Sequence, residues 1–352
     1  MIGAMAEQRS GSPEVTDQGS STSGQRRTTT VLALVLAVVF AAAVLGGAKI
    51  LVDRNVYTPV SMGPVDAPEA ESETCAAVVA ALPDRTGDYR SVDLTDPAPA
   101  GAAAYRSSGG DELTVRCGVS VPTQFTEISE LVSHGGTDWL RIDDATRGSD
   151  LSTWYSLGGS PVVAVTGSTG PDTPLDKVID MDGIGSAVSS HTDGPAPVAG
   201  DVPLTGLSAG DAGGAGDAAC AAFAGELPET LGEYGRITST TVDGEGTTAG
   251  TALDSLAGSG SLAVWTAPGR EPVVVRCGVA LPGSYRAGAQ LTQVDEVPWF
   301  EDTELGNGST AGVWYALGYA GTVAVSLPLD AGDVVLPVLS GVIAGSMEKT
   351  GS

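Results

Sequence analysis

The tetrapeptide RCGV occurs twice in this chain, at residues 116–119 within ELTVRCGVSVP and at residues 276–279 within EPVVVRCGVALP. In the first stretch Leu113, Val115 and Cys117 alternate with Thr114 and Arg116, which is the period of a β-strand that buries one face. The cysteine therefore lies on the buried face and Arg116 on the opposite one. A strand sequence that occurs twice with so few differences indicates a duplicated unit.

The duplication extends well beyond this strand. An offset of 160 residues aligns 103–165 with 263–325 without a gap, and upstream an offset of 145 places Cys75 on Cys220. The second copy therefore has fifteen extra residues, within a Thr/Gly/Ser-rich stretch ahead of Trp265. Two copies, each long enough for its own core, are typical of a tandem duplication rather than a solenoid.

Each copy starts with a helical pattern and continues with strands. In the first copy, Cys75, Val78 and Leu82 fall on one face of a helix that Pro83 ends. Strand-like runs follow, and a closing helix begins near Thr173. The sequence predicts an α+β fold: a single N-terminal transmembrane helix, then two duplicated small domains, each with a helix, about four mainly antiparallel strands and a helix.

The transmembrane prediction rests on residues 31–48, eighteen residues without a charge. Extended through Val52, with Lys49 reaching the interface, this run can cross about 30 Å of hydrocarbon at 1.5 Å per residue. A buried core helix and a signal peptide that is cleaved on secretion are the alternatives. The membrane is thus a predicted partner, contacted through one helix.

Charge and cysteines indicate where the rest of the chain lies. The formal charge of −26 disfavours nucleic acid as a partner. Basic residues are balanced on the two sides of the apolar run, so they give no orientation. The part after Val52 carries all four cysteines, and disulfides persist mainly outside the cytoplasm. We expect a single-pass protein of the cell membrane, with a cytoplasmic N-terminus and extracytoplasmic C-terminal domains.

Composition shifts then divide the chain into six predicted segments. Gly, Pro and Ala dominate the stretch between the copies, as in interdomain linkers. The segments are a disordered cytoplasmic tail (1–30), the transmembrane helix (31–52), an extracytoplasmic stalk (53–72), the first α+β repeat (73–188), a Gly/Pro/Ala linker (189–216) and the second α+β repeat (217–348).

The four cysteines allow three disulfide pairings, and their spacing alone does not choose among them. A unit that was copied whole is expected to keep its own bond, which pairs Cys75 with Cys117 and Cys220 with Cys277. Free buried thiols and a four-cysteine metal site are the alternatives. Zinc sites usually show a CxxC pair or a nearby histidine, and the chain has neither at that spacing.

Catalytic motifs are missing from the sequence. The chain contains no GxSxG, HExxH or Walker motif in a suitable context, and its two histidines, His134 and His191, have no histidine counterpart in the other copy. We therefore predict no catalytic residues, no cofactor and no metal, and expect that the protein is not an enzyme.

The candidate binding residues are large aromatic and cationic side chains at equivalent positions of the two copies. The tryptophans could stack on sugar rings or line an apolar groove, or they could fill a small core. The arginines could bind an anion or form a structural ion pair. These candidates are Trp139, Trp154, Trp299, Trp314, Arg116 and Arg276.

Taken together, the motifs resemble the actinobacterial family catalogued as domain of unknown function 3515. The second copy is the more similar, through CAAFAGELPETL (220–231), AVWTAPGREPVVVRCGVALP (263–282), QLTQVDEVPWF (290–300) and TVAVSLPLDAGDVVLPVL (322–339). The resemblance covers about two thirds of the chain, as two tandem units. It implies a secreted or membrane-anchored envelope protein, with no assigned activity and no catalytic residues.

Three functions are compatible with these patterns. The first is a non-catalytic binding or scaffolding module of the cell envelope, whose partner is an envelope protein or a cell-wall ligand. The second is a glycan or lipid binder that uses the paired tryptophans. The third is a hydrolase that works through two carboxylates, which in a glycosidase lie about 5–9.5 Å apart.

Overall fold

The computed structural model describes residues 23–168, 175–210, 213–237, 262–303 and 310–350. The chain forms two compact units, Met1–Asn55 and Val56–Ser352, which are described separately. The first unit contains the helix α1 (Ser23–Val56). Its segment Val31–Lys49 has a mean hydropathy of 2.7 and is not buried by any other part of the chain. A helix of this length and composition can anchor the protein in a membrane.

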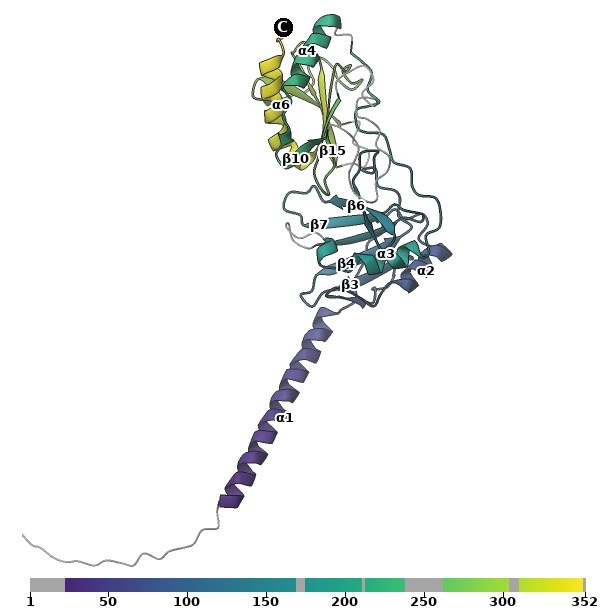
Figure 1. The fold of residues 1–352 in the computed structure, drawn as a ribbon, viewed down its shortest axis with the longest axis vertical. Coiled ribbons are helices and arrows are strands. Elements are labelled where there is room, and N and C mark those ends of the chain that lie inside the picture. Colours follow the sequence, from purple (N-terminus) through teal and green to yellow (C-terminus); the bar gives the residue numbers. More distant parts are fainter. Residues whose placement is uncertain (1–22, 169–174, 211–212, 238–261, 304–309, 351–352) are drawn as a thin grey trace, which may run out of the picture. The chain divides into compact units, whose positions relative to one another are not determined.

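The second unit contains two antiparallel sheets with the same strand order (Figure 1). The first has the order β1-β2-β3-β4-β8-β7-β6-β5 and the second β9-β10-β11-β12-β16-β15-β14-β13. The first sheet consists of β1 (Arg85–Thr86), β2 (Tyr89–Val92), β3 (Ala102–Arg106), β4 (Glu112–Cys117), β5 (Leu131–His134), β6 (Thr137–Asp143), β7 (Leu151–Ser156) and β8 (Val163–Ser168). The second consists of β9 (Thr230–Leu231), β10 (Tyr234–Ile237), β11 (Leu262–Thr266), β12 (Val273–Cys277), β13 (Thr292–Val294), β14 (Val297–Asp302), β15 (Ala311–Ala316) and β16 (Val323–Pro328).

The α+β class and the antiparallel pairing agree with the sequence prediction, but the strand count does not. Within the described residues each sheet has eight strands instead of about four. The extra strands are short, such as β1 and β5, and too short for a clear alternation of apolar residues. They form because each can pair with a neighbour across a tight turn.

Helices cover one face of each sheet, which we call the inner face. They are α2 (Glu73–Ala81), η1 (Leu175–Lys177) and α3 (Met181–Ser189) on the first sheet, and α4 (Gly213–Gly225), η3 (Leu329–Ala331) and α6 (Gly332–Ser346) on the second. The closing helix α3 begins later than predicted, because Asp180 caps it by accepting a hydrogen bond from Gly183 N at 3.0 Å. The predicted start near Thr173 lies outside the described residues.

The RCGV strands β4 and β12 lie inside the sheets, β4 between β3 and β8 and β12 between β11 and β16. The cysteine faces the helices, and the following glycine turns the chain: φ is +81° at Gly118 and +80° at Gly278. A Cβ on Gly118 would lie only 2.3 Å from the carbonyl carbon of Glu69. Glycine is required there because other residues disfavour positive φ and have no space for a side chain.

The outer face of each sheet is covered by the chain that precedes its first helix. We call residues 60–69 the first strap and residues 202–210 the second strap. Val60 of the first strap pairs with Leu94 after β2, Val202 of the second strap packs in the outer-face cluster of the second sheet, and both are buried. The straps hydrogen-bond at the RCGV glycines, through Glu69 N to Gly118 O (3.2 Å) and Gly210 N to Gly278 O (2.8 Å).

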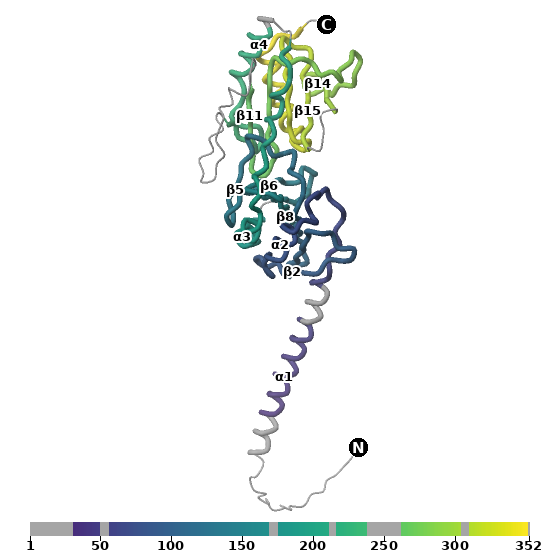
Figure 2. The backbone as a smooth tube through the Cα atoms, turned by 90° about the vertical axis from the view of Figure 1, so that its right-hand side faces the viewer, coloured from purple at the N-terminus to yellow at the C-terminus, as the bar shows by residue number. Residues whose placement is uncertain are grey.

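The straps correct the interpretation of two predicted segments. The linker (189–216) and the stalk (53–72) were expected to be spacers, yet part of each is packed against a sheet. The second strap turns over the sheet at residues 203–206, through Thr205 N to Val202 O (3.3 Å) and Leu207 N to Leu204 O (3.2 Å), and its Val202 and Leu204 are buried. The path of the linker from α3 to α4 can be followed in Figure 2.

Candidate ligand site at the repeat junction

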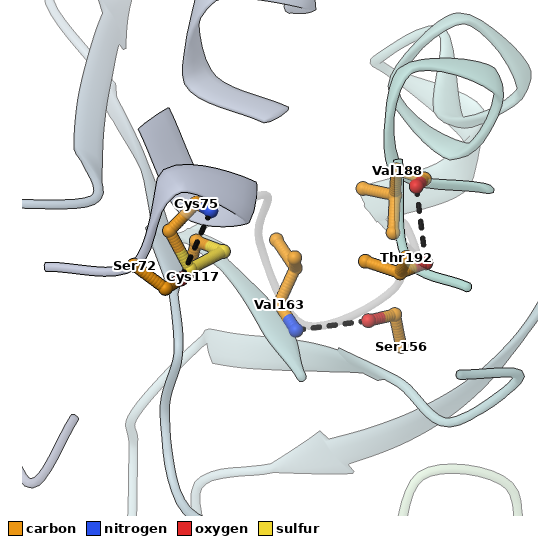
Figure 3. The surroundings of a disulfide bond; sticks show 7 residues. All are labelled: Ser72, Cys75, Cys117, Ser156, Val163, Val188 and Thr192. Carbon is orange, nitrogen blue, oxygen red and sulfur yellow. Dashed lines mark hydrogen bonds between the residues drawn. A yellow bond between two sulfur atoms is a disulfide. The ribbon is translucent and has the colours of Figure 1, made fainter. Parts of the chain in front are cut away.

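The predicted disulfides form within the repeats. Cys75 of α2 is bonded to Cys117 of β4, and Cys220 of α4 to Cys277 of β12, with Cα–Cα distances of 5.4 and 5.6 Å. Each bond joins the first helix of a repeat to its RCGV strand. Figure 3 shows the first bond, beside the cap that Ser72 Oγ provides by accepting a hydrogen bond from Cys75 N at 3.1 Å.

The predicted tryptophans lie on the inner faces. Trp139 and Trp299 are fully buried, and their indole N–H groups donate to His134 O (3.2 Å) and to Ser340 Oγ (3.0 Å). Trp154 is also buried, and its equivalent Trp314 is half-buried against the core of the second repeat. These side chains fill core volume, as the core alternative predicts, and this placement does not favour stacking on a glycan.

The predicted arginines hold the straps. Arg116 Nη2 donates to Gly63 O at 2.6 Å, while Arg276 Nη1 donates to Leu204 O (2.8 Å), Thr205 O (3.1 Å) and Leu207 O (2.8 Å). Within the described residues neither arginine forms an ion pair. The structural ion pair considered from the sequence is therefore not formed there: each strap passes over the outer face and brings its carbonyl oxygens to the guanidinium.

The two repeats meet along one edge through a hairpin turn of the second repeat. Asp143 N, at the end of β6, donates to Gly269 O in the turn between β11 and β12, at 2.7 Å. Arg141 and Asp143 form two hydrogen bonds of 2.8 and 2.7 Å beside this turn. A Cβ on Gly269 would lie 2.4 Å from Asp143 Oδ2, so only glycine fits here.

A second contact is made by the loop that follows the first RCGV strand. Its backbone pairs with the linker, through Gly200 N to Phe125 O at 2.9 Å and Glu127 N to Gly200 O at 3.1 Å. Ile128 of this loop belongs to one buried cluster with the second strap and with outer-face residues of the second sheet. The cluster contains Ile128, Val202, Leu204, Val264, Val274, Val279, Phe300, Tyr315 and Ala324.

Between these contacts lies a cavity of about 440 Å³, which we call the junction cavity. Small-molecule sites typically have volumes of about 300–1,000 Å³ and often lie between domains. Three parts of the chain line it: residues 123–126 of the first repeat, residues 201–207 of the linker and strap, and the ends of β12, β15 and β16.

The outer faces of the two sheets differ where the second one lines this cavity. Val274, Ser326 and Val313 lie side by side on β12, β16 and β15. The same row on the first sheet is Thr114, Thr166 and Thr153 on β4, β8 and β7, in which Thr153 Oγ1 and Thr166 Oγ1 are 2.9 Å apart. Valine has replaced threonine twice, so the second face is the more apolar one.

The sequence analysis did not identify the junction cavity, although one signal was available. Alignment of the copies places Val313 on Thr153 and Val274 on Thr114. Such an exchange marks a place where the outer faces of the two copies have different surroundings. In the described part of the chain, no group of three or more His, Cys, Asp or Glu side chains is placed to hold a metal ion.

Comparison with known families gives a match over most of the chain. The family model described as protein of unknown function, DUF3515, matches residues 34–193 and again residues 184–351. No curated protein and no solved structure matches the chain.

Proposed function

The chain belongs to the family of proteins of unknown function DUF3515, as two tandem copies, and from this premise we propose that it is a non-catalytic, membrane-anchored binding module of the cell envelope. In this proposal α1 holds the protein in the membrane and the two repeats bind an envelope protein or a cell-wall ligand outside the cytoplasm. The two disulfides support the extracytoplasmic location, because such bonds persist mainly in oxidising compartments.

The observation that carries the binding role is the divergence of the two outer faces. A duplication starts with two identical faces, and here the row beside the cavity carries Val274 and Val313 where the first copy has Thr114 and Thr153. The packing there leaves the junction cavity open, although protein interiors are normally filled. This difference between the two outer faces is better explained by a binding site at the junction than by two identical modules joined by a spacer.

Site-directed photo-crosslinking in the native membrane tests this proposal. Gly206 lines the junction cavity, and a side chain added to it would meet nothing within 4 Å. A benzophenone amino acid at this position should form an adduct with a native ligand or partner. Pro64 is the matched control, because it is exposed and lies at the equivalent place of the first strap.

The proposal requires an adduct at Gly206 and none at Pro64. An adduct of equal yield at both positions would mean that exposure alone determines the reaction. No adduct at either position would contradict the placement of binding at the junction.

A further inference from the structure

The second repeat binds one of its own arginines. Arg270, in the turn between β11 and β12, donates to Asp330 of η3 and, through Nε at 3.4 Å, to Tyr234 Oη. The same Nε lies 3.5 Å from Glu233 Oε1, and the Arg270 side chain is 17 % exposed. Two carboxylates and a phenol oxygen thus surround one guanidinium, a group whose planar set of donors suits such acceptors.

The first repeat has equivalents of these acceptors but not the arginine. Alignment of the copies places Asp88 and Tyr89 on residues 233–234, whereas the position of Arg270 is Gly110. At this place the first repeat has a pocket of about 620 Å³, which we call the turn pocket. Its wall consists of residues from the β1–β2 turn, the β3–β4 turn, the ends of β7 and β8, and η1.

A tyrosine in the wall of the turn pocket has an unused hydroxyl group. Tyr89 is 4 % exposed, and its hydroxyl makes no hydrogen bond within the part of the chain that the structure describes. The hydroxyl is not sealed from solvent. Its equivalent in the second repeat, Tyr234, accepts the bond from Arg270. A donor that enters the turn pocket can therefore satisfy the Tyr89 hydroxyl oxygen.

Three carboxylates surround this hydroxyl or line the same wall. Asp88, Asp111 and Asp150 line the turn pocket and form no ion pair among the described residues. Asp111 accepts a hydrogen bond from Ser107 Oγ at 2.8 Å. Burial, followed by the charges of Asp111 and Asp88, raises the pKa of Tyr89, so both carboxylates act on its hydroxyl.

The wall also contains a lysine, which is already paired. Lys177 Nζ lies 3.0 Å from Asp176 Oδ2, and the Lys177 side chain is 69 % exposed. Asp176 is the second residue of η1, as Asp330 is of η3. Lys177 therefore neutralises one equivalent of the acceptors of Arg270 and leaves Asp88 and the Tyr89 hydroxyl without a partner.

We propose that the turn pocket binds the guanidinium group of a ligand, in the place that Arg270 takes in the second repeat. The guanidinium donates to the Tyr89 hydroxyl oxygen and pairs with Asp88 and Asp111. An arginine side chain of a partner protein and a small guanidinium compound both supply this group. The turn pocket belongs to the first repeat alone, so this inference goes beyond the proposed function and does not depend on binding at the junction.

Three probes test the ligand class: ethylguanidinium, ethylurea and ethylammonium. Ethylurea has the planar shape without the charge, and ethylammonium has the charge without the planar set of donors. The full chain is placed in nanodiscs of zwitterionic lipid, and binding is followed by saturation-transfer NMR. We expect ethylguanidinium to bind about tenfold more tightly than ethylurea and several-fold more tightly than ethylammonium.

Variants assign the binding to the turn pocket. Asp88→Asn and Tyr89→Phe should each weaken ethylguanidinium binding several-fold, because each removes a partner of the guanidinium. Lys177→Met should strengthen it, since the variant removes a like charge and releases Asp176. Glu130→Gln is the matched control, because it removes the same charge as Asp88→Asn from an exposed position of the first repeat outside this wall.

The second repeat provides a positive control. Arg270→Ala removes the internal guanidinium, and ethylguanidinium should then restore part of the melting temperature that the second repeat loses. If ethylguanidinium restores this variant but does not bind the wild type, the turn pocket is not an equivalent site and the inference is wrong. Equal binding of the three probes, or equal weakening by Asp88→Asn and Glu130→Gln, would also overturn it.

A fourth probe identifies the source of the guanidinium. Arginine capped by an acetyl group and a methylamide resembles an arginine within a protein chain. We expect it to bind at least as tightly as ethylguanidinium, as a partner protein requires. Exclusion of the capped arginine while ethylguanidinium binds would assign the turn pocket to a small compound. The photo-crosslinking at Gly206 tests the junction cavity separately, so the two proposals stand or fail independently.

Discussion

Tyr105 and Trp265 occupy equivalent positions in the two repeats, and each donates a hydrogen bond to the backbone carbonyl of an equivalent proline. Tyr105 Oη bonds to Pro83 O at 2.9 Å and Trp265 Nε1 to Pro228 O at 3.0 Å, so each side chain ties β3 or β11 to the proline that follows the first helix. Both side chains are fully buried. A phenol and an indole are interchangeable here because each has an apolar body and a donor at one end.

This burial predicts a loss of stability in alkali. Desolvation by burial, with a smaller effect of Asp84, raises the pKa of Tyr105 to about 12, whereas a tyrosine in the unfolded chain titrates near 10. The contribution is fully present below about pH 10 and is lost as the pH rises through about 12. The free energy of unfolding of the first repeat, measured by urea denaturation at each pH, should therefore fall in this range.

Tyr105→Phe provides the comparison for this prediction. The variant should lose about 1 kcal/mol at neutral pH, because the carbonyl of Pro83 loses its donor. Its first repeat should then show a weaker alkaline loss than the wild type. An unchanged alkaline profile would assign the effect to other groups.

Helix, strand and strap are the elements that each repeat combines. The disulfide fixes the first helix to the inner face of the sheet. The arginine that precedes the cysteine on the same strand fixes the strap to the outer face. The RCGV sequence therefore has a separate role for each of its first three residues. Arg holds the strap, Cys holds the helix, and Gly allows the chain to turn.

Removal of one disulfide should affect only its own repeat. The Cys220–Cys277 bond closes a sequence separation of 57, for which chain entropy gives about 4 kcal/mol. We expect Cys220→Ser to lower the melting temperature of the second repeat and to leave Cys277 open to alkylation. Cys75→Ser should do the same to the first repeat only. A crosslink between repeats in unreduced wild-type peptides would contradict the pairing.

The strap can be tested by removing its guanidinium. Arg276→Met keeps much of the side-chain volume but removes the donor of Thr205 O and Leu207 O and one of the two donors of Leu204 O, and each carbonyl left unsatisfied costs about 1–3 kcal/mol. The Gly210 amide should then exchange at least tenfold faster. Arg116→Met removes one such bond, so the Glu69 amide should respond less. Equal responses would mean that the carbonyl contacts do not hold the straps.

At the scale of the whole molecule, the two repeats make different contacts. Ile128 of the first repeat shares a buried cluster with the outer face of the second, and the aligned position of the second repeat is Gly288. The outer face of the first sheet carries Thr114 and Thr153 instead of valines. The contact between the repeats is therefore made by residues that the two copies do not share.

A fragment experiment follows from this asymmetry. A fragment of residues 215–352 contains the predicted second repeat but lacks the second strap, so its apolar outer face is uncovered. Extension to residues 200–352 restores Val202 and Leu204, each worth about 1.5–3 kcal/mol when buried. The longer fragment should melt at a higher temperature and aggregate less. Identical melting curves would show that the strap adds no stability.

Topology is the second prediction at this scale. The apolar α1 and the two disulfides, which persist mainly outside the cytoplasm, predict that protease added to intact spheroplasts digests the chain beyond about residue 52 and spares the N-terminal tail. Immunoblots with an epitope at each end give the measurement. Protection of the C-terminal epitope would reverse the proposed orientation, and loss of the N-terminal part from the membrane without protease would indicate cleavage on secretion.

The sequence by itself determined the features that local pattern or duplication encodes. The apolar run of α1, the two-copy organisation and the pairing of Cys75 with Cys117 and Cys220 with Cys277 follow from hydropathy, alignment and the copying of a closed unit. The α+β class also follows, because helical and strand periodicities are readable in short windows.

Only the tertiary structure decided how the outer faces are covered and where the cavity lies. The second strap reads as a flexible linker because Gly and Pro dominate it, and nothing local reveals that Val202 and Leu204 meet a sheet some 60 to 120 residues further along the chain. Arg276 likewise has its partners in that strap rather than in a carboxylate near it in sequence. Such contacts depend on the free energy of burying surfaces that become neighbours only after the sheet has formed, so local patterns do not contain them.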